Sequence, residues 1–301
     1  MSTEISLDAL VPAQMADKAV QVGIKKSQTD TASLLVLAIL AGAFIALGAV
    51  FATSVTAGTA GELPFGIIKL ITGLSFTLGL ILVIVGGAEL FTGNNLITMA
   101  YASGKVTMSG LLRNWVIVYA GNFVGAIATA VLLFLTKQYM QGGGAVGLNA
   151  LNVGEAKTSL DFGQAVALGI MCNALVCMAV WLCYGARSTT DKILSIIPPI
   201  AAFVAAGFEH SVANMYYIPV ALLIKNQGDS AFFTAIGKAP GDFANLTWEN
   251  FFVANLLPVT IGNIIGGAVM VGLIYWFIYL RKSRTAAVPA PGTAAPSAAS
   301  K

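Results

Sequence analysis

The sequence predicts an all-α membrane protein with six transmembrane helices, arranged as two inverted repeats of three helices. Three observations carry this prediction. The chain of 301 residues is 57% hydrophobic and only 10% charged, with a mean hydropathy of +0.83, whereas soluble domains carry about 25% charged residues. Several long segments contain no charge. Two further apolar stretches are interrupted by polar motifs that resemble each other.

Four segments contain no charge, 31–61, 114–136, 162–186 and 250–280, and they predict membrane-spanning helices over about 33–57, 111–136, 162–186 and 250–280. Each is longer than the ~20 apolar residues that a helix needs to cross a hydrocarbon core. A β-barrel is not expected, because its strands would alternate in hydrophobicity over about ten residues each.

Two other apolar stretches have awkward lengths. The 42 residues between Glu62 and Lys105 are interrupted only by Lys69 and Glu89, and residues 193–224 are interrupted by Glu209 and His210. As one straight helix the first stretch would be about 63 Å long, and as two spans it would barely fit. The second stretch is too short for two spans. We therefore expect each to cross once, as a helix with a break.

The basic residues support this assignment. If each stretch crosses once and both termini are cytoplasmic, the inner side holds Lys18, Lys25, Lys26, Lys105, Arg113, Arg187, Lys192, Arg281, Lys282, Arg284 and Lys301. The outer side then holds Lys69, Lys137, Lys157, Lys225 and Lys238. Two crossings in each stretch would divide the charges almost equally. The positive-inside rule thus favours six spans, with the second and fifth broken.

The two breaks form part of an internal repeat. GAELFTGN at 87–94 and GFEHSVAN at 207–214 share the pattern G-x-E-x-x-x-(G/A)-N, and NWVIVYAGNFVGA from Asn114 aligns with NLLPVTIGNIIGG from Asn255. A repeat with three crossings must insert its second copy upside down. Paired broken helices in inverted repeats indicate a permeation site near the bilayer midplane. Irregular backbone is tolerated there only where protein buries it or it lines a wet cavity.

Glu89 and Glu209 occupy the same position in the two breaks. We interpret them as structural braces that accept hydrogen bonds from N–H groups of the broken helices, which lipid cannot satisfy. A role as proton sites stays open. His210 is the only histidine in the chain. It is a candidate for a role in the pore, because ionisable groups inside a membrane are commonly functional and histidine titrates near pH 6.5. The alternative is a hydrogen-bonded core residue.

Other classes of protein fit the sequence less well. Cys172, Cys177 and Cys183 match no zinc-binding pattern, and we expect neither a metal nor a cofactor. The basic residues flank apolar segments and form no stripe, so nucleic acid is not an expected partner. Ser75 lacks the second glycine of the G-x-S-x-G motif expected of an intramembrane serine protease, and Ser211 is not flanked by glycines, so no enzyme activity is expected.

The chain is expected to have three parts. Residues 1–30 are amphipathic and carry no visible signal peptide. They predict a cytoplasmic helix in the membrane interface that starts near Pro12. Residues 31–283 form the membrane domain, in contact with lipid. Residues 284–301 are rich in Ala and Pro and predict a disordered cytoplasmic tail.

The paired motifs resemble those of the formate/nitrite transporter family. The similarity includes GAELFTGNN at 87–95, GFEHSVANMYYIP at 207–219 and the lead-in PAQMADKAVQVGIKK at 12–26. The resemblance implies an aquaporin-like bundle, assembled as a homopentamer in the bacterial inner (cytoplasmic) membrane with one pore in each protomer. It implies small monovalent anions of weak acids as substrates, with formate first. Nitrite or hydrosulphide transport and proton-coupled anion symport stay open.

The resemblance also implies roles for single residues. One constriction is expected from Phe76, Leu80 and Phe203, and the other from Leu80, Phe91 and Val176. The central polar set is expected to be Thr92, His210, Asn173 and Asn263, with Lys157 attracting anions near the outer entrance. His210 would donate a hydrogen bond or lend a proton to the anion, which would make passage depend on pH. The N-terminal segment is expected to gate the pore from the cytoplasmic side.

Overall fold

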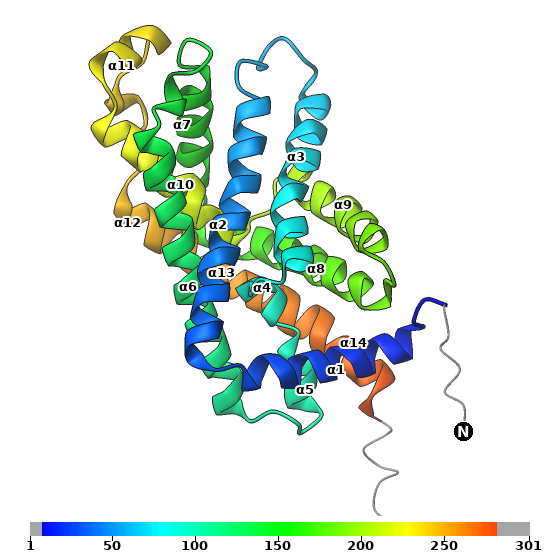
Figure 1. Cartoon of the computed structure of the whole chain (residues 1–301). Helices are drawn as coiled ribbons and strands as arrows, with labels where there is room; N and C mark the ends of the chain where they lie inside the picture. Colours follow the sequence, from blue (N-terminus) through cyan, green and yellow to red (C-terminus); the bar gives the residue numbers. More distant parts are fainter. Residues whose placement is uncertain (1–7, 282–301) are drawn as a thin grey trace, which may run out of the picture.

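The computed structural model describes residues 8–281 (Figure 1). The regular structure in this range is helical, apart from an isolated bridge between Ala60 and Leu63. The α-helices are α1 Pro12–Gln28, α2 Thr31–Val55, α3 Phe65–Gly86, α4 Phe91–Asn94, α5 Ile97–Ala102, α6 Met108–Leu135, α7 Ala145–Thr158, α8 Phe162–Gly185, α9 Thr189–Ala205, α10 Ser211–Gln227, α11 Ser230–Ile236, α12 Trp248–Asn250, α13 Leu257–Ile264 and α14 Ile274–Tyr279. The expected tail at 284–301 and the first residues of the N-terminal segment lie outside the described range.

Five helical segments of the described chain are long and apolar enough to cross a membrane. They are α2, α3, α6, α8 and the continuous segment Trp248–Tyr279. Four of them coincide with the clear spans, and α3 with the first part of the interrupted stretch 62–105. The other interrupted stretch is divided into α9 and α10, each of 17 residues. Both interrupted stretches therefore contain the expected break.

A glycine in the left-handed region ends the first part of each broken segment. Gly87 follows α3 with φ of 84°, and Gly207 follows α9 with φ of 76°. Only glycine adopts this conformation without steric cost. The next N–H group in each break then reaches back five residues, from Ala88 to Val83 and from Phe208 to Phe203, as in a Schellman motif. The two breaks are thus built by the same local geometry.

Short helices cover the two ends of the bundle (Figure 1). Helix α1 begins at Pro12, as expected, and lies across one end beside α5. Helices α7 and α11 lie at the opposite end. Helix α7 was not predicted, because it falls in a connection between two expected spans and is too short to cross a membrane. Within the last predicted span, Phe251–Leu256 and Ile265–Leu273 are π-helical, which the sequence did not predict.

Small residues allow the long helices to pack closely. Helix α6 lies against α2 at Gly125, where a Cβ atom would overlap the carbonyl of Ile39. Gly266 lies in the same way against Ile170 of α8. These contacts confirm the close helix approach that small residues four apart allow.

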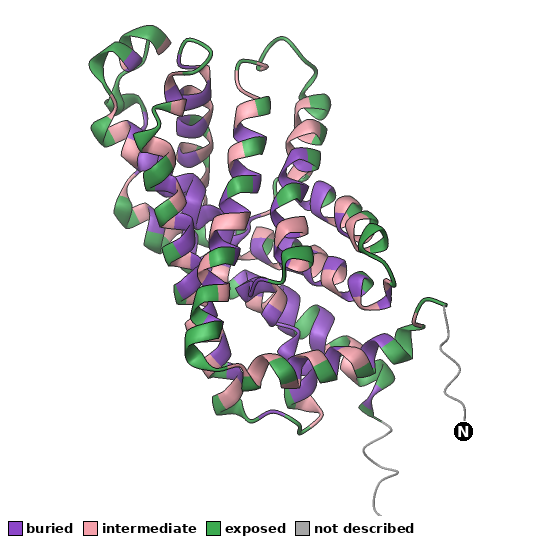
Figure 2. Ribbon diagram, viewed as in Figure 1, coloured by how far each residue is buried: buried purple, intermediate pink, exposed green. Residues whose placement is uncertain are grey.

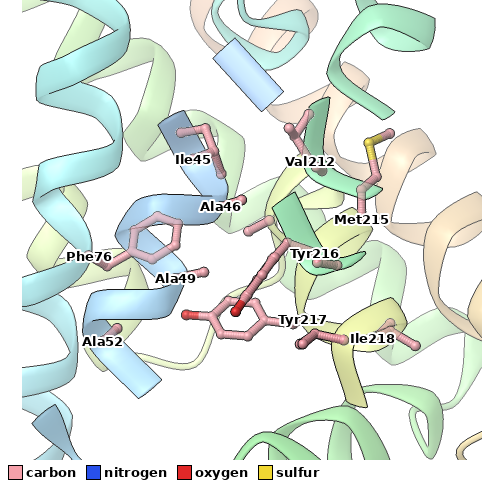
Figure 3. Close-up of a cluster of buried hydrophobic side chains, with 14 of the residues drawn as sticks. Ile45, Ala46, Ala49, Ala52, Phe76, Val212, Met215, Tyr216, Tyr217 and Ile218 are labelled. Atoms are coloured by element: carbon pink, nitrogen blue, oxygen red, sulfur yellow. The ribbon is translucent and has the colours of Figure 1, made fainter. Parts of the chain in front are cut away.

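The core between α2 and α10 combines alanines with aromatic rings. Figure 3 shows Ala46 and Ala49 of α2 near Tyr216 and Tyr217 of α10. Helix α10 is buried along almost its whole length (Figure 2), and it holds the polar residues of the second break inside the bundle.

Candidate functional site

Two cavities enter the bundle from its opposite ends. The first has a volume of about 500 Å³ and extends from α7 to the second break, where Glu209 and His210 line it. The second has a volume of about 290 Å³ and extends from α1 to the first break, where Glu89 and Asn94 line it. Each broken segment therefore lies at the inner end of one cavity.

Helix α3 shows how close the two cavities come. Its residues up to Phe76 line the first cavity, and its residues from Leu80 onward line the second. Four residues of α-helix correspond to a rise of about 6 Å. The barrier between the cavities is therefore about one helical turn thick along α3, and it lies where the constriction was expected.

Aromatic and aliphatic side chains form this barrier. The rings of Phe76 and Phe203 meet edge to face, with centroids 5.8 Å apart, and Phe203 stacks on His210 at 6.0 Å. Phe76, Phe203 and Leu80 are each at most 3% exposed. The structure thus brings together the three residues expected at the first constriction.

The residues expected at the second constriction are buried but line neither cavity. Val176 lies on α8 and is 1% exposed. Phe91 opens α4, and its ring packs edge to face on Trp115 and Tyr119 of α6. Of this set only Leu80 borders a cavity.

His210 and Thr92 connect the two breaks. The Nε2 atom of His210 lies 2.9 Å from the Thr92 hydroxyl. The Nδ1 atom accepts a hydrogen bond from the N–H of Ala213 at 3.0 Å, so His210 caps helix α10. A nitrogen that accepts carries no proton, so the ring proton of the neutral imidazole lies on Nε2. Nε2 then donates to Thr92, and the hydroxyl proton of Thr92 is directed to another acceptor.

Asn122 and Asn263 hold the two breaks in the same way. The side chain of Asn263 accepts from the N–H of Ser211 at 2.9 Å and donates to the carbonyls of Glu209 and Gly169 at 3.0 and 2.9 Å. Asn122 makes the equivalent three bonds, with Phe91, Glu89 and Ala38. Each amide thus satisfies three backbone groups, two of them from the break itself, and Asn263 is a bracket for the second break.

The glutamate of each break forms an ion pair with a lysine of a short helix. Lys26 of α1 lies 2.7 Å from Glu89, and Lys157 of α7 lies 2.7 Å from Glu209. Asn94 and Asn214 donate to the same two carboxylates, each at 2.7 Å.

The glutamates therefore connect structural elements, but through different partners from those expected. Their carboxylates accept from lysine and asparagine side chains, whereas backbone N–H groups of the breaks bond to Asn122 and Asn263. An amide reaches backbone groups without the cost of burying a further charge. The carboxylates instead neutralise the two lysines.

Lys157 and Asn173 also have partners within the protein. Lys157 lines the first cavity, and its ammonium lies over the ring of Tyr217 as well as beside Glu209. Asn173 is fully buried and donates to the carbonyls of Thr92 and Asn263. It thereby links helix α8 to both the first break and the last span.

Several residues of this network were not assigned a role from sequence. Asn114 and Asn255 bond to Asn94 and Asn214, and both pairs stand at matching positions of the repeat. Lys26 was not predicted, because the internal repeat was recognised only within the predicted membrane spans. The signal was present, since Lys26 and Asp30 precede α2 at the same spacing as Lys157 and Asp161 precede α8.

Comparisons with known proteins agree with this geometry. The family described as formate/nitrite transporter matches residues 13–277. The chain is 47% identical to the formate channel FocA of Escherichia coli K12 over 94% of its own length and 99% of that protein. It is 39% identical to the Haemophilus influenzae protein of the same name, covering 91% and 96% of the two chains. A solved structure described as a pentameric formate channel with formate bound superimposes with a TM-score of 0.79, at 47% identity, over 83% of this chain and 98% of that one.

Proposed function

The chain belongs to the formate/nitrite transporter family, and from this membership we propose that it is a membrane channel for small monovalent anions of weak acids, formate above all. The observation that carries the proposal is the pair of cavities that approach Phe76 and Leu80 from opposite ends of the bundle. Relatives that match nearly the whole chain are named formate channels.

We propose six transmembrane spans in two inverted repeats with an aquaporin-like arrangement. In this scheme the second span is α3 with α4 and α5, and the fifth is α9 with α10. The matched bonds of Asn122 and Asn263, and of Lys26 and Lys157, support the repeat. The membrane domain then covers residues 31–283, between the interfacial segment 1–30 and the tail 284–301.

The proposed assembly is a homopentamer in the bacterial inner membrane, with both termini cytoplasmic. Support comes from the similarity to the pentameric channel structure and from the excess of basic residues at the end that carries α1. Native mass spectrometry of the purified protein is expected to give five chains per particle. Protease treatment of sealed, right-side-out vesicles is expected to leave both termini intact.

An anion must cross the barrier without a full hydration shell. Burial of an isolated charge in an apolar slit is very costly, and Phe76, Leu80 and Phe203 supply such a slit. Phe91 and Val176 remain the proposed walls of the second slit. Between the slits, hydrogen-bond donors would replace lost water.

We assign the donor role to Thr92 and His210. Because Nε2 of His210 points its proton at Thr92, the threonine hydroxyl can donate to an anion that reaches the barrier. Asn173 and Asn263 would act mainly by fixing the backbone around this pair. Lys157 would attract anions into the first cavity through the ammonium N–H groups that do not bond to Glu209. A proton relay through His210 would require Nδ1 to release the N–H of Ala213.

The test is anion flux into proteoliposomes between pH 5 and 8, compared for formate, nitrite and hydrosulphide. The proposal expects formate to be carried, and His210→Asn to change both the rate and its pH dependence, because the variant has no imidazole ring to lend a proton to the anion. Thr92→Val, which removes only the hydroxyl, is expected to reduce flux without abolishing assembly. A protein that carries nitrite or hydrosulphide but excludes formate would contradict the substrate assignment.

Unchanged flux and unchanged pH dependence in His210→Asn would rule out any relay through the histidine. Formate uptake that is driven uphill by a proton gradient would instead identify a proton-coupled symporter.

A further inference from the structure

The cavity beside α1 has an unbalanced set of charges. Its lining includes the ammonium groups of Lys18, Lys26 and Lys192 but only one carboxylate, that of Glu89. Lys26 is paired with Glu89 at 2.7 Å. Lys18 and Lys192 are therefore left as a positive pair at the wall of the cavity, one from α1 and the other from the start of α9.

Neither of these two lysines has an acidic partner among residues 8–281. Lys18 donates to the backbone carbonyl of Tyr184 at 2.8 Å. The ammonium of Lys192 makes no hydrogen bond or ion pair within the described chain. Burial, followed by the nearby charges of Lys192 and Arg187, lowers the pKa of Lys18. A cationic cluster of this kind is stabilised by any anion that enters it.

The acidic group at the start of α9 has another function. The carboxylate of Asp191 caps α9 by accepting from the N–H groups of Arg187 and Ser188 at 3.1 and 2.9 Å. These bonds hold the carboxylate of Asp191 at the N-terminus of α9. Arg187 itself donates to the backbone carbonyl of Asp8 at 2.6 Å. The residues just before α1 and just before α9 are therefore in contact beside this cluster.

We propose that Lys18 and Lys192, with Arg187 beside them, form a binding site for a phosphate-class oxyanion that fastens α1 to α9. Its phosphate group has at least two free oxygens that share negative charge, so it contacts ammonium groups from two elements at once. Inorganic phosphate also has more oxygens than formate and more than one charge at neutral pH, so the site holds it more firmly than formate. The site is separate from the barrier at Phe76 and Leu80. Because it holds α1 at the entrance of the second cavity, it regulates access to that cavity.

The bound anion limits the motion of α1. Lys18 and Lys26 lie on the same helix, and only Lys26 has a carboxylate in place. An oxyanion at Lys18 supplies the second charged attachment, so α1 opens less often. The source of the anion is either free phosphate or the headgroup of an anionic lipid, since α1 is amphipathic and lies across the end of the bundle.

The test is amide hydrogen exchange of Pro12–Gln28 in the full-length protein in nanodiscs. Zwitterionic nanodiscs are compared with and without inorganic phosphate at constant ionic strength, and with nanodiscs that contain phosphatidylglycerol. Local opening sets the exchange rate. If the phosphate concentration is about tenfold above its Kd, amide exchange that requires the opening of α1 is expected to be about tenfold slower with phosphate than without it in the wild type. In Lys192→Gln this protection is expected to be lost.

Lys105→Gln is the matched control, because Lys105 is exposed and lines neither cavity. It is expected to keep the protection. Protection by phosphate identifies the free anion as ligand, and protection only with phosphatidylglycerol identifies the headgroup. The absence of protection in both conditions overturns the site, as does equal protection in wild type and Lys192→Gln. The exchange readout does not depend on which anion the pore carries.

Discussion

A single side-chain amide beside the second break stabilises more than one segment of backbone. Asn263 satisfies three groups, on Ser211, Glu209 and Gly169. In a soluble protein, water would compensate for the loss of such bonds, but a buried membrane segment has no such substitute. The side chain is therefore both a structural bracket and a condition for keeping His210 in place.

Replacement of Asn263 by Leu is expected to be strongly destabilising. Each buried polar group left without a partner costs about 1–3 kcal/mol, and the substitution removes the partner of three such groups. The measurement is unfolding in a mixed detergent series. Asn149→Leu is the control, because Asn149 bonds to Thr53 and Thr56 at the wall of a cavity where water can replace it. Equal effects of the two substitutions would contradict the bracket role of Asn263.

At the residue scale, the sequence predicted which polar residues lie at the breaks better than it predicted the partners of these residues. Glu89, Glu209 and His210 were found because they stand at costly positions in the two breaks, whereas Thr92 was assigned from the family resemblance. Their partners were not predictable, because contacts between a break and a distant helix depend on how the helices are oriented. The matched spacing of Lys26 and Asp30 with Lys157 and Asp161 marks the two lysines, but it does not indicate that they pair with glutamates far away in the chain.

The helices approach each other through glycines at the positions where the repeats coincide. Gly121 and Gly125 of α6 contact α2, and Gly262 and Gly266 contact α8. The hydrophobic pattern predicted the long helices well, because each must cover the same thickness of hydrocarbon. It did not predict α7 or the π-helical segments, which depend on packing rather than on hydropathy.

Substitution of Gly125 by Ala is expected to prevent normal packing of α6 on α2. The added methyl group would overlap the carbonyl of Ile39, which is backbone and has little freedom to move. Overpacking commonly costs about 1–3 kcal/mol. The yield of monodisperse protein in gel filtration measures the effect. Gly66→Ala in α3 is the control, because no atom lies within 4 Å of its Cβ position, and wild-type behaviour of Gly125→Ala would refute the close contact.

The whole molecule contains ion pairs in two different environments. The Lys157–Glu209 pair at 2.7 Å has side chains that are 16% and 7% exposed. The Lys137–Asp229 pair at 2.9 Å has side chains that are 65% and 48% exposed. Contact with Lys137 lowers the pKa of Asp229, so any stabilisation by this pair is present at neutral pH and is lost as the pH falls through that lowered value.

The loss of the lysine is expected to affect stability differently in these two ion pairs. Lys157→Met leaves a buried carboxylate without its cation, which typically costs about 3–5 kcal/mol. Lys137→Met removes an exposed pair and is expected to have little effect on stability, because water screens its charges. Thermal unfolding at neutral pH distinguishes the two. Similar unfolding temperatures for both variants would show that Glu209 is held by Asn214 and Asn255 alone.

The thin barrier between the cavities has an electrical consequence. If both cavities fill with electrolyte, the membrane potential falls mainly between Phe76 and Leu80, over about 6 Å instead of the roughly 30 Å of the bilayer. The local field there is about fivefold steeper than the average field. A permeating anion would then gain or lose nearly the whole membrane voltage in one short step, and the rate of that step would set how strongly the current depends on voltage.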